Sequence, residues 1–580
     1  MPTAWVPLEL QLAEKVEEGT NIVSLQELEI LNAQNAPVVL NPKQLNTFLK
    51  VQHSLGKLLY FNEAKLRDFI IINPAYMVDI LRSVVTEKQF WPEGKNYADV
   101  LDNLQKNGRI SRDEIYCLWN QRHFQHILPY KEHMLEMLVH LDILVPPKTT
   151  FEDITQSGDV SNNDYLVPCM ITKPNCTQYL DKVRLPSKSI LLSYTFIEEV
   201  IPPALSYRFL ASLLTMWDLK IYKGMLMLFS DLAVVEVDEN HDVTLQVTGN
   251  RVVVSLIHSI KKEDIAPSLA SSIQECLTAT VYRISEFYSI LSSDGKQTER
   301  ESKPTTSYTT AMPFNIEFGV FCPQSMFTKK AKSMCFLSYH EYASTRHSSW
   351  KCSDHNKTHK IKSLQLWLTE KIPLERCLRS CKGLGLELTL SPSYKHLYRV
   401  VKKLTTETCR KLIIHLGLSH RLWSNLQDEF QNFPGFSDNM MFAALVTWKR
   451  GNVHSTFMQL KEALLQCDMD EHILCQAFRD ITPDTHGLTE EILNKTPSNS
   501  SLNLLSKHIG VSVVQLGVEL GLDISEIEEI QYEYKNKLSD QTKEVLKRWL
   551  KQKTERPTVR TLVKAMHRIE KVDCIRQIKF

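Results

Sequence analysis

The feature that most constrains the fold is a series of short amphipathic segments between Leu502 and Phe580. Apolar side chains recur there at helical spacing, and a glycine or a capping residue ends or starts each segment. Gly510 ends the first segment, Asp523 begins a short acidic helix, and Thr558 begins another helix after Pro557. Helices this short are stable only when they pack together. The sequence therefore predicts a small all-helical bundle at the C-terminus.

The charged residues of this bundle are segregated by sign along the sequence. The acidic group comprises Asp523, Glu526, Glu528 and Glu529, and the basic group comprises Lys543, Lys547, Arg548, Lys551, Lys553, Arg556 and Arg560. Patches of opposite sign on two sides of one small bundle suit head-to-tail assembly. Charge runs are also the ordinary solvated faces of helices, so a single residue here need not contact a partner. We predict that the two groups are protein-interaction surfaces.

A second helical region, from Ser391 to Asp480, precedes the C-terminal bundle. Its amphipathic segments are separated by brief loops, and Ser419 is a good N-cap for one of them. The predicted helices are Cys409–Leu416, a helix from Ser419 through Phe430, Met440–Trp448, Ser455–Leu465 and His472–Phe478. Several short helices with brief loops predict an antiparallel bundle.

Three runs in the C-terminal bundle carry a family resemblance. They are Gly517…Leu520-Gly521-Leu522, Ile527-Glu528-Glu529-Ile530, and Leu546-Lys547-Arg548-Trp549-Leu550 followed by Pro557-Thr558, Leu562 and Ala565. This pattern resembles a death domain, a six-helix module that docks onto others of its kind. The preceding region resembles a second, divergent death domain, in Leu416-Gly417-Leu418, Ala443-Ala444-Leu445…Trp448 and Phe457…Leu460. We expect Trp448 and Trp549 to lie in the hydrophobic cores of their bundles.

The N-terminal region alternates helices with short strands. Gln44–Leu59 and Tyr76–Val84 have apolar helical faces, and Phe69–Ile72 is typical of a strand. The same features recur in Asp113–Trp119, His133–Leu141 and Tyr165–Ile171, and the order predicts a winged-helix unit. DNA binding would need clustered cations, and the helix from residue 75 to 86 offers only Arg82, with Lys88 just beyond it. We therefore predict a packing helix and no nucleic-acid partner.

The next region predicts an α+β arrangement. Ile190–Tyr194 is typical of a strand, and Pro202–Trp217 has a helical apolar stripe. Gly249-Asn250 indicates a tight turn between two of the strands that follow. The predicted meander consists of Gly224–Phe229, Leu232–Val237, Val243–Val247 and Arg251–Ile257.

These first two regions resemble the COR region of Roco proteins. The resemblance rests on Trp5 with Leu8 and Leu10, the run from His53 to Phe61, Asn73-Pro74-Ala75-Tyr76, Tyr165-Leu166-Val167-Pro168, and Phe196…Pro203…Arg208-Phe209. In that family a GTPase domain, Roc, precedes COR, and COR often serves in dimer contacts. A phosphate-binding loop needs Gly-x-x-x-x-Gly-Lys-Ser/Thr, which neither Gly56-Lys57 nor Gly295-Lys296 completes. Since the chain begins almost where COR begins, we expect a truncated product or a fragment.

Three polar stretches separate the predicted parts, at 151–164, 292–310 and 481–501. The expected fold class is mixed: an α/β COR region with winged-helix and meander parts, followed by all-α six-helix bundles. The boundaries are 1–175 for the winged-helix region, 182–290 for the α+β region, 314–390 for a β-rich segment with cysteines and histidines, 395–480 for the divergent bundle and 501–580 for the death domain.

Cysteine and histidine residues gather between Cys322 and His359. Thiolates and imidazoles are the ligands of structural zinc, so Cys335, Cys352, His355 and His359 are candidate metal ligands. Cys322-Pro323 resembles the start of a zinc knuckle, but Ser325 stands where the paired cysteine would be. No complete paired-ligand motif is present, and free thiols with exposed histidines are the alternative.

Composition excludes several other functions. The 580 residues carry a formal net charge of +1, which provides no global attraction for nucleic acid or anionic membranes. The 13 cysteines are scattered rather than dense, and no apolar run is long enough to span a membrane. No signal peptide is apparent, so a cytoplasmic location is expected.

The sequence therefore predicts a non-catalytic signalling scaffold with no cofactor and no small-molecule substrate. Its expected partners are other death-domain proteins and a second copy of the chain through the COR-like region. The sequence does not distinguish an apoptotic from an inflammatory pathway. One alternative is a regulatory part of a Roco GTPase whose GTP-binding domain is missing from this sequence. A second alternative is a zinc-stabilised binding module.

Overall fold

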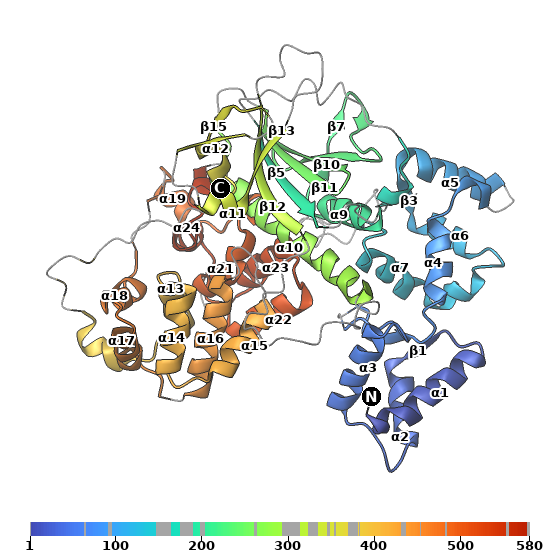
Figure 1. Ribbon diagram of the computed structural model, residues 1–580, viewed down its shortest axis with the longest axis horizontal. Helices are drawn as coiled ribbons and strands as arrows, with labels where there is room; N and C mark the ends of the chain where they lie inside the picture. The colour runs from blue at the N-terminus through green and yellow to red at the C-terminus, as the bar shows by residue number, and fades with distance from the viewer. Residues whose placement is uncertain are drawn as a thin grey trace. The chain divides into compact units, whose positions relative to one another are not determined.

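The computed structural model is drawn in Figure 1 with its helices and strands labelled. The chain divides into two compact units. The first comprises Met1–Cys176, Pro202–Val235 and Glu286–Thr298, and the second comprises Thr177–Ile201, Glu236–Ser285 and Glu299–Phe580. The structure describes residues 2–62, 65–90, 95–146, 164–173, 189–197, 203–259, 264–292, 314–322, 334–344, 348–352, 355–368, 377, 381, 383–430, 437–452, 454–481, 484–485, 487–552 and 556–576. The predicted linkers 151–164 and 292–310 lie almost wholly outside these residues, as does Lys553.

The first unit begins with an α-β-α-α-β repeat. Its elements are α1 (Val6–Glu17), β1 (Ile22–Ser24), α2 (Leu25–Gln34), α3 (Pro42–Ser54) and β2 (Phe69–Ile71). Asn41 and Gln44 form a capping box that starts α3 at Pro42, two residues before the predicted start. The helix predicted over Gln44–Leu59 ends at Ser54, before Gly56 at φ 67°. β1 pairs antiparallel with β2, and an isolated bridge joins Leu59 to Ile71. The winged-helix assignment of this region stays a prediction.

The same order then occurs a second time. α5 (Lys95–Asn107), β3 (Arg109–Ser111), α6 (Arg112–Trp119), α7 (Lys131–His140) and β4 (Asp164–Leu166) form the second repeat. β3 pairs with β4, and Val145 bridges to Leu166. The strand predicted over Tyr165–Ile171 is shorter in the structure, where β4 ends at Leu166. It stops there because Pro168 starts a 3-10 turn over Pro168–Met170.

The strand pair β1–β2 is shared by the cores of the two repeats. Val23 and Ile70 pack into the first core with Trp5 and Phe48, whereas Ile22 and Ile71 pack into the second. Alternate residues of a strand face opposite sides, so one short ribbon serves both cores. α4 (Tyr76–Val84) also packs into the second core, which confirms the predicted packing helix.

The first unit is completed by α9 (Pro203–Met216) and short strands. The strands are β6 (Asp218–Leu219), β7 (Ile221–Tyr222), β8 (Met225–Leu226) and β9 (Leu232–Glu236). The buried Arg208 side chain pairs with Asp142 at 3.2 Å, which attaches α9 to the second repeat. The predicted strand over Gly224–Phe229 is reduced to β8, since Gly224 has φ 76° and turns the chain into a β7–β8 hairpin.

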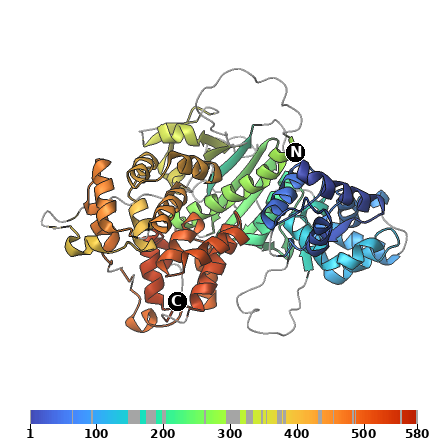
Figure 2. The same cartoon turned by 90° about the horizontal axis from the view of Figure 1, so that it is seen from below.

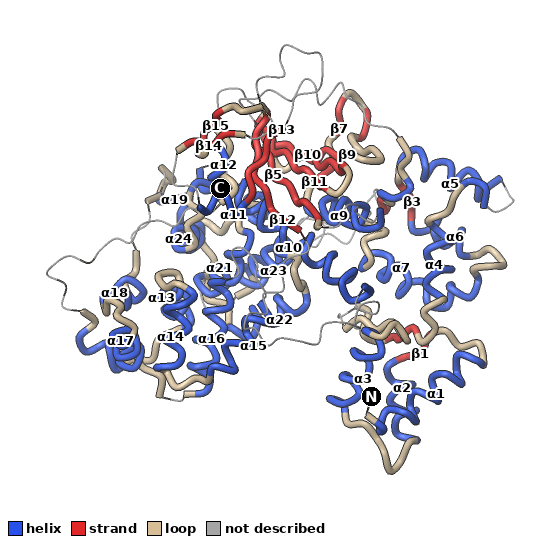
Figure 3. The backbone as a smooth tube through the Cα atoms, viewed as in Figure 1, coloured by secondary structure: helices blue, strands red, loops and turns tan. Residues whose placement is uncertain are grey.

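The second unit contains an antiparallel sheet, drawn red in Figure 3. Within this unit the strand order is β13 (Met334–Ser338), β12 (Phe314–Phe321), β5 (Ser189–Phe196), β11 (Arg251–His258) and β10 (His241–Thr248). Thr248 pairs with Arg251, so Gly249-Asn250 is the predicted two-residue turn, with Gly249 at φ 59°. Strands predicted in a later β-rich segment therefore extend the sheet of β5. A separate hairpin, β14 (Ser349–Lys351) with β15 (Thr358–Lys360), lies beyond α11 (Tyr339–Ser344) and is followed by α12 (Lys362–Gln365).

A long helix, α10 (Pro267–Ser292), packs against this sheet. The buried Tyr194 hydroxyl of β5 donates to the Gln274 carbonyl at 3.2 Å and lies 2.9 Å from the Thr278 hydroxyl. From Ser268 to Val281 every residue is buried, including serines, threonines and Glu275. A helix that is buried on all sides has structure packed around it on every face.

Six helices in the described part of the chain form the middle bundle, and the sequence predicted the last five of them. They are α13 (Tyr394–Val401), α14 (Thr406–His415), α15 (His420–Phe430), α16 (Ser437–Gly451), α17 (Phe457–Gln466) and α18 (His472–Phe478). The first and last helices, α13 and α18, pack against each other, and Trp423 and Trp448 lie in the core. Death-domain identity for this bundle stays a prediction.

The C-terminal bundle lies beside the middle bundle (Figure 2). It contains α20 (Asn499–Ser506), α21 (Val513–Glu519), α22 (Ile524–Glu533), α23 (Leu538–Leu550), α24 (Val559–Arg568) and a 3-10 turn over Asp573–Arg576. The expected linker 481–501 is wrong in its second half, because α19 (Glu490–Leu493) and the start of α20 lie there. Thr489 and Ser498 cap these two helices, so the polar residues mark helix starts rather than a linker.

None of the helices in the described part of the chain has both the length and the apolar composition that crossing a membrane requires.

Candidate functional site

The predicted acidic group begins at the start of α22. The Glu526 carboxylate accepts a hydrogen bond from the backbone N–H of Asp523 at 3.0 Å, and the Asp523 carboxylate accepts from the first turn of the helix. Such a capping box stabilises a helix by about 1 kcal/mol. These two carboxylates therefore stabilise the helix start, and no partner is needed to explain them.

The other two acidic residues are engaged within the chain. Glu528 accepts two hydrogen bonds from Arg450 of α16, at 2.8 and 2.9 Å. Glu529 pairs with Arg548 of α23 at 2.6 Å. The acidic and basic groups thus meet where α22 packs on α23, and their predicted placement on two separate sides is wrong at this point. The sequence could not show this, because Glu529 and Arg548 lie on different helices and only the packing of these helices brings them together.

Most of the basic group is also paired. Lys543 lies 3.7 Å from Asp540, Lys547 lies 3.3 Å from Glu544, and Arg560 pairs with Glu490 of α19. Lys551 and Arg556 differ from these. Both are exposed, and neither side chain has a hydrogen-bond or ion-pair partner among the residues that the structure describes. Within the predicted basic group, the unpaired cations of the described structure are therefore Lys551, directly after α23, and Arg556, shortly before α24.

A buried polar contact joins the C-terminal bundle to α10. Lys571 is 1% exposed, donates to the Ser271 hydroxyl at 2.7 Å, and lies 3.9 Å from the Glu275 carboxylate. Glu275 also accepts a hydrogen bond from the backbone N–H of Val511 at 2.9 Å. Buried charges are tolerated when they are paired and hydrogen-bonded, and this network meets both conditions. We call this contact with α10 the dock.

Two further hydrogen bonds complete the dock. The Asp573 carboxylate accepts from the backbone N–H of Ser268 at 2.8 Å, and the Ser268 hydroxyl lies 3.0 Å from His508 Nδ1. Burial lowers the pKa of His508 to about 4, although the carboxylates of Asp573 and Asp238 oppose that shift. The imidazole of His508 is therefore neutral at physiological pH.

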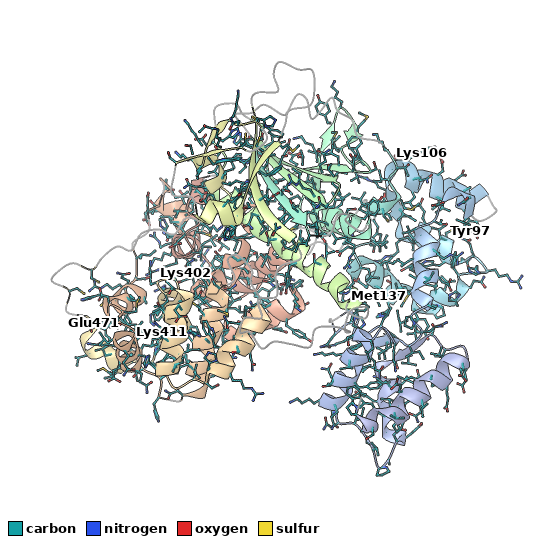
Figure 4. All side chains as sticks on the ribbon, viewed as in Figure 1. Tyr97, Lys106, Met137, Lys402, Lys411 and Glu471 are labelled. Carbon is teal, nitrogen blue, oxygen red and sulfur yellow. The ribbon has the colours of Figure 1, made fainter. Side chains whose placement is uncertain are left out.

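The middle bundle contacts the C-terminal bundle through a second set of buried charges. Arg399 of α13 donates to both carboxylate oxygens of Glu519 at 2.8 and 2.6 Å, and to the carbonyl of Ala477 at 3.1 Å. Lys402, labelled in Figure 4, lies at the end of α13, 3.2 Å from Asp438 and 3.9 Å from Glu570. Bidentate arginine–carboxylate pairs fix orientation as well as contact. The C-terminal bundle is thus held from two directions within the second unit.

Comparison with protein families identifies the two ends of the chain. The model for the C-terminal of Roc, COR-A domain, matches residues 2–171, and the death-domain model matches residues 499–580. The chain carries a COR-A domain and a death domain. The COR-A match covers both α-β-α-α-β repeats, and the death-domain match covers α20 to the end of the chain. No curated protein matches the chain.

In the segment from Cys322 to His359, the structure brings together four of the predicted cysteines and histidines. Cys322, Cys335, Cys352 and His359 offer ligand atoms that all lie within 4.8 Å of one another. We call these four residues the first cluster. β12, β13 and the β14–β15 hairpin supply them, so the set includes Cys322, for which sequence spacing had found no paired ligand. His355 is not in the set, but its Nδ1 lies 3.1 Å from Cys335 Sγ.

The first cluster has the chemistry of a metal site. Three of its residues are buried, and His359 Nε2 is buried without a hydrogen-bond partner in the described structure. Burial opposes ionisation of Cys352, but a hydrogen bond from the Lys357 backbone and the neighbouring His359 ring lower its pKa to about 6. A thiolate is the form that binds metal.

A second cluster was missed by sequence reasoning. Cys377, Cys381, His472 and Cys475 likewise offer ligand atoms within 4.8 Å of one another. The spacings Cys-x-x-x-Cys and His-x-x-Cys were visible in the sequence, and either pair alone has ligand spacing. What hid the site was distance along the chain, since Cys381 and Cys475 lie 94 residues apart.

Proposed function

We propose that the chain is a non-catalytic signalling scaffold whose death domain recruits other death-domain proteins through the cationic end of α23. The observation that carries this proposal is the contrast within one domain. Lys543, Lys547, Arg548 and Arg560 are all paired within the chain, whereas Lys551 and Arg556 are exposed without a partner in the described part. Unpaired cations keep their full attraction for an acidic partner surface.

The dock supports the same proposal from the other side. The contact with α10 covers the face of the death domain that contains His508, Val511 and Lys571. Glu528 of the same domain is paired with Arg450. A partner that binds the intact chain therefore has the end of α23 available to it. We propose that the scaffold presents its death domain in this fixed orientation.

The test is binding of the full-length chain to a panel of purified death domains, measured by isothermal titration calorimetry. The charge-reversed variant Lys551→Glu/Arg556→Glu is expected to bind at least about tenfold more weakly, because two like charges then face an acidic surface. The matched control is Lys43→Glu/Lys50→Glu, since both lysines are exposed on α3 and the change in net charge is identical. Equal binding by the two variants, or no binding to any death domain, would refute the proposal.

We further propose that the COR-A domain contributes self-association. Val6 and Leu10 lie one turn apart on α1 and are 47% and 59% exposed, which leaves apolar surface on one helix face. Mass photometry of the full chain is expected to show dimers, and Leu10→Glu is expected to shift them to monomers. A monomer at all concentrations would contradict this part of the proposal.

The matched COR-A description favours one alternative, that the chain is a regulatory part of a Roco GTPase. The present sequence contains no Gly-x-x-x-x-Gly-Lys-Ser/Thr loop, so any nucleotide site would have to be supplied by another segment. Binding of this chain to an immobilised Roc domain, together with a change in its GTP hydrolysis, would favour the alternative over the scaffold.

We also propose that the first cluster binds a structural zinc ion. Three cysteines and one histidine are a common ligand set for such sites. The ion would fix the β14–β15 hairpin to the edge of the sheet at β13. Cys352→Ser is expected to reduce the zinc content of the purified chain by one ion.

A further inference from the structure

The second cluster joins two parts of the chain that are distant in sequence. Cys377 and Cys381 precede the middle bundle, and His472 and Cys475 lie on α18. Residues three apart on a helix share a face, so His472 and Cys475 both point to the side where the cysteine pair lies. Cys475 is 1% exposed, and the other three are half-buried. The four side chains therefore converge from a loop and a helix.

Two of the distances within the second cluster match tetrahedral coordination. Cys381 Sγ lies 3.9 Å from Cys475 Sγ, and Cys475 Sγ lies 3.7 Å from His472 Nδ1. Zinc bound at its usual distances to sulfur and nitrogen would separate two sulfurs by about 3.8 Å and a sulfur from a nitrogen by about 3.6 Å. A disulfide would need about 2.05 Å between sulfurs, and it would leave two of the four residues without a role.

The surroundings of the second cluster supply a positive charge. The Arg479 guanidinium, one turn after Cys475, donates to Cys381 Sγ at 3.1 Å. Three thiolates and a zinc ion carry a net charge of about −1, and an arginine hydrogen-bonded to one sulfur balances it. Hydrogen bonds to ligating sulfur are the usual second layer of a structural zinc site.

We infer that the second cluster binds one structural Zn²⁺ ion, which fastens the segment before the middle bundle to α18. Each of the three thiols loses its proton to the solvent as its Zn–S bond forms, and neutral His472 provides the fourth ligand. The site needs no redox change and no further reactant.

The end of α18 that this zinc ion fastens is also where the death domain is attached. Arg399, which pairs with Glu519 of the death domain, donates to the Ala477 carbonyl. Arg568 of α24 donates to the Arg479 carbonyl, and Lys564 lies 3.4 Å from Asp480. α18 is only seven residues long, too short to be stable by itself. The zinc ion therefore stabilises the surface on which the death domain rests.

The test is metal analysis of the purified full-length chain, using inductively coupled plasma mass spectrometry after dialysis against metal-free buffer. Cys381→Ser is the main variant because Cys381 is partly exposed, and Cys475→Ser is the second. Each is expected to contain one zinc ion fewer than the wild type. Cys467→Ser is the matched control, since this cysteine lies in the same bundle outside the cluster, and its zinc content is expected to equal that of the wild type.

A second measurement tests the inference even if the Cys381→Ser and Cys475→Ser variants do not fold. Zinc removal from the wild type by a chelator is expected to raise hydrogen exchange in residues 472–478 together with 564–568. The inference is overturned if Cys381→Ser retains the wild-type zinc content, or if intact-mass analysis finds Cys381 and Cys475 joined as a disulfide. Because Cys352→Ser reports on the first cluster separately, failure of one zinc site does not hide the other.

Discussion

At the scale of single residues, the dock depends on an ion pair that water does not reach. Lys571 is 1% exposed and Glu275 is 7% exposed, and each has a further hydrogen-bond partner in Ser271 or the Val511 backbone. Removing one member of such a pair leaves the other charge buried without compensation. The two residues should therefore behave as a unit, although they lie on opposite sides of the contact.

This coupling leads to a double-mutant prediction. Lys571→Met is expected to lower the free energy of unfolding by about 3–5 kcal/mol, because the Glu275 carboxylate then stays buried and unpaired. Adding Glu275→Gln is expected to recover part of that loss, since glutamine can still accept from Val511. Equilibrium urea unfolding of the single and double variants measures the coupling energy. Strictly additive losses would show that the two residues do not interact.

His508 makes the dock sensitive to acid. Its pKa is about 4 in the folded chain against 6.5 in the unfolded chain, so the unfolded state binds the proton first as the pH falls. The contribution of neutral His508 to the free energy of unfolding is therefore fully present above pH 6.5. It is lost as the pH falls from 6.5 to 4, by about 3 kcal/mol in all. The charged groups around the ring are Asp573, Asp238, Lys571 and His241.

The matching variant is His508→Gln, which can keep a hydrogen bond to Ser268 but does not titrate. Its free energy of unfolding is expected to vary less with pH than that of the wild type between pH 6.5 and 4. Urea unfolding at several pH values tests this, and two parallel profiles would rule out His508 as the source of the acid sensitivity.

At the scale of secondary-structure elements, sequence patterns predicted those helices and strands that bury one face. α3, α4 and α17 have such patterns and were predicted. α10 was not predicted, because it is buried on all sides and its serines and threonines obscure any stripe. α19 was missed because four residues among prolines and serines resemble a loop. In both cases, packing by distant parts of the chain decides the structure.

The approach of the death domain to α10 depends on a glycine. Gly510 has φ 58°, and a Cβ atom there would lie 1.8 Å from Glu275 Oε2. Gly510→Ala is therefore expected to lose about 1 kcal/mol from the backbone conformation and more from separation of the dock. Gly521→Ala is the control, because Gly521 has φ 84° but its nearest neighbour, Lys395 Nζ, would lie 3.8 Å from the added atom.

Thermal unfolding distinguishes these two glycine variants. A clearly lower melting temperature for Gly510→Ala than for Gly521→Ala would show that contact with Glu275, and not backbone strain alone, requires the glycine. Equal melting temperatures would show that the dock does not need this close approach.

At the scale of the whole molecule, the sequence was informative about the two ends and less so about what joins distant segments. The COR region and the death domain were predicted from local runs of residues, and the family comparisons match COR-A over residues 2–171 and a death domain over residues 499–580. The COR assignment of residues 182–290 stays a prediction. The pairing of β12 with β5, the two cysteine–histidine clusters and the dock all join residues far apart in the chain. No local pattern encodes such contacts, so the predicted interaction patches could not be divided into paired and unpaired charges.

The central claim is that the docked death domain binds its partners through the end of α23. Hydrogen–deuterium exchange of the full chain, with and without a bound death domain, locates the contact directly. We predict new protection at residues 547–560 and unchanged protection at residues 268–281 and 508–513. Protection elsewhere in the death domain with none at 547–560, or loss of protection in α10 on binding, would contradict the account.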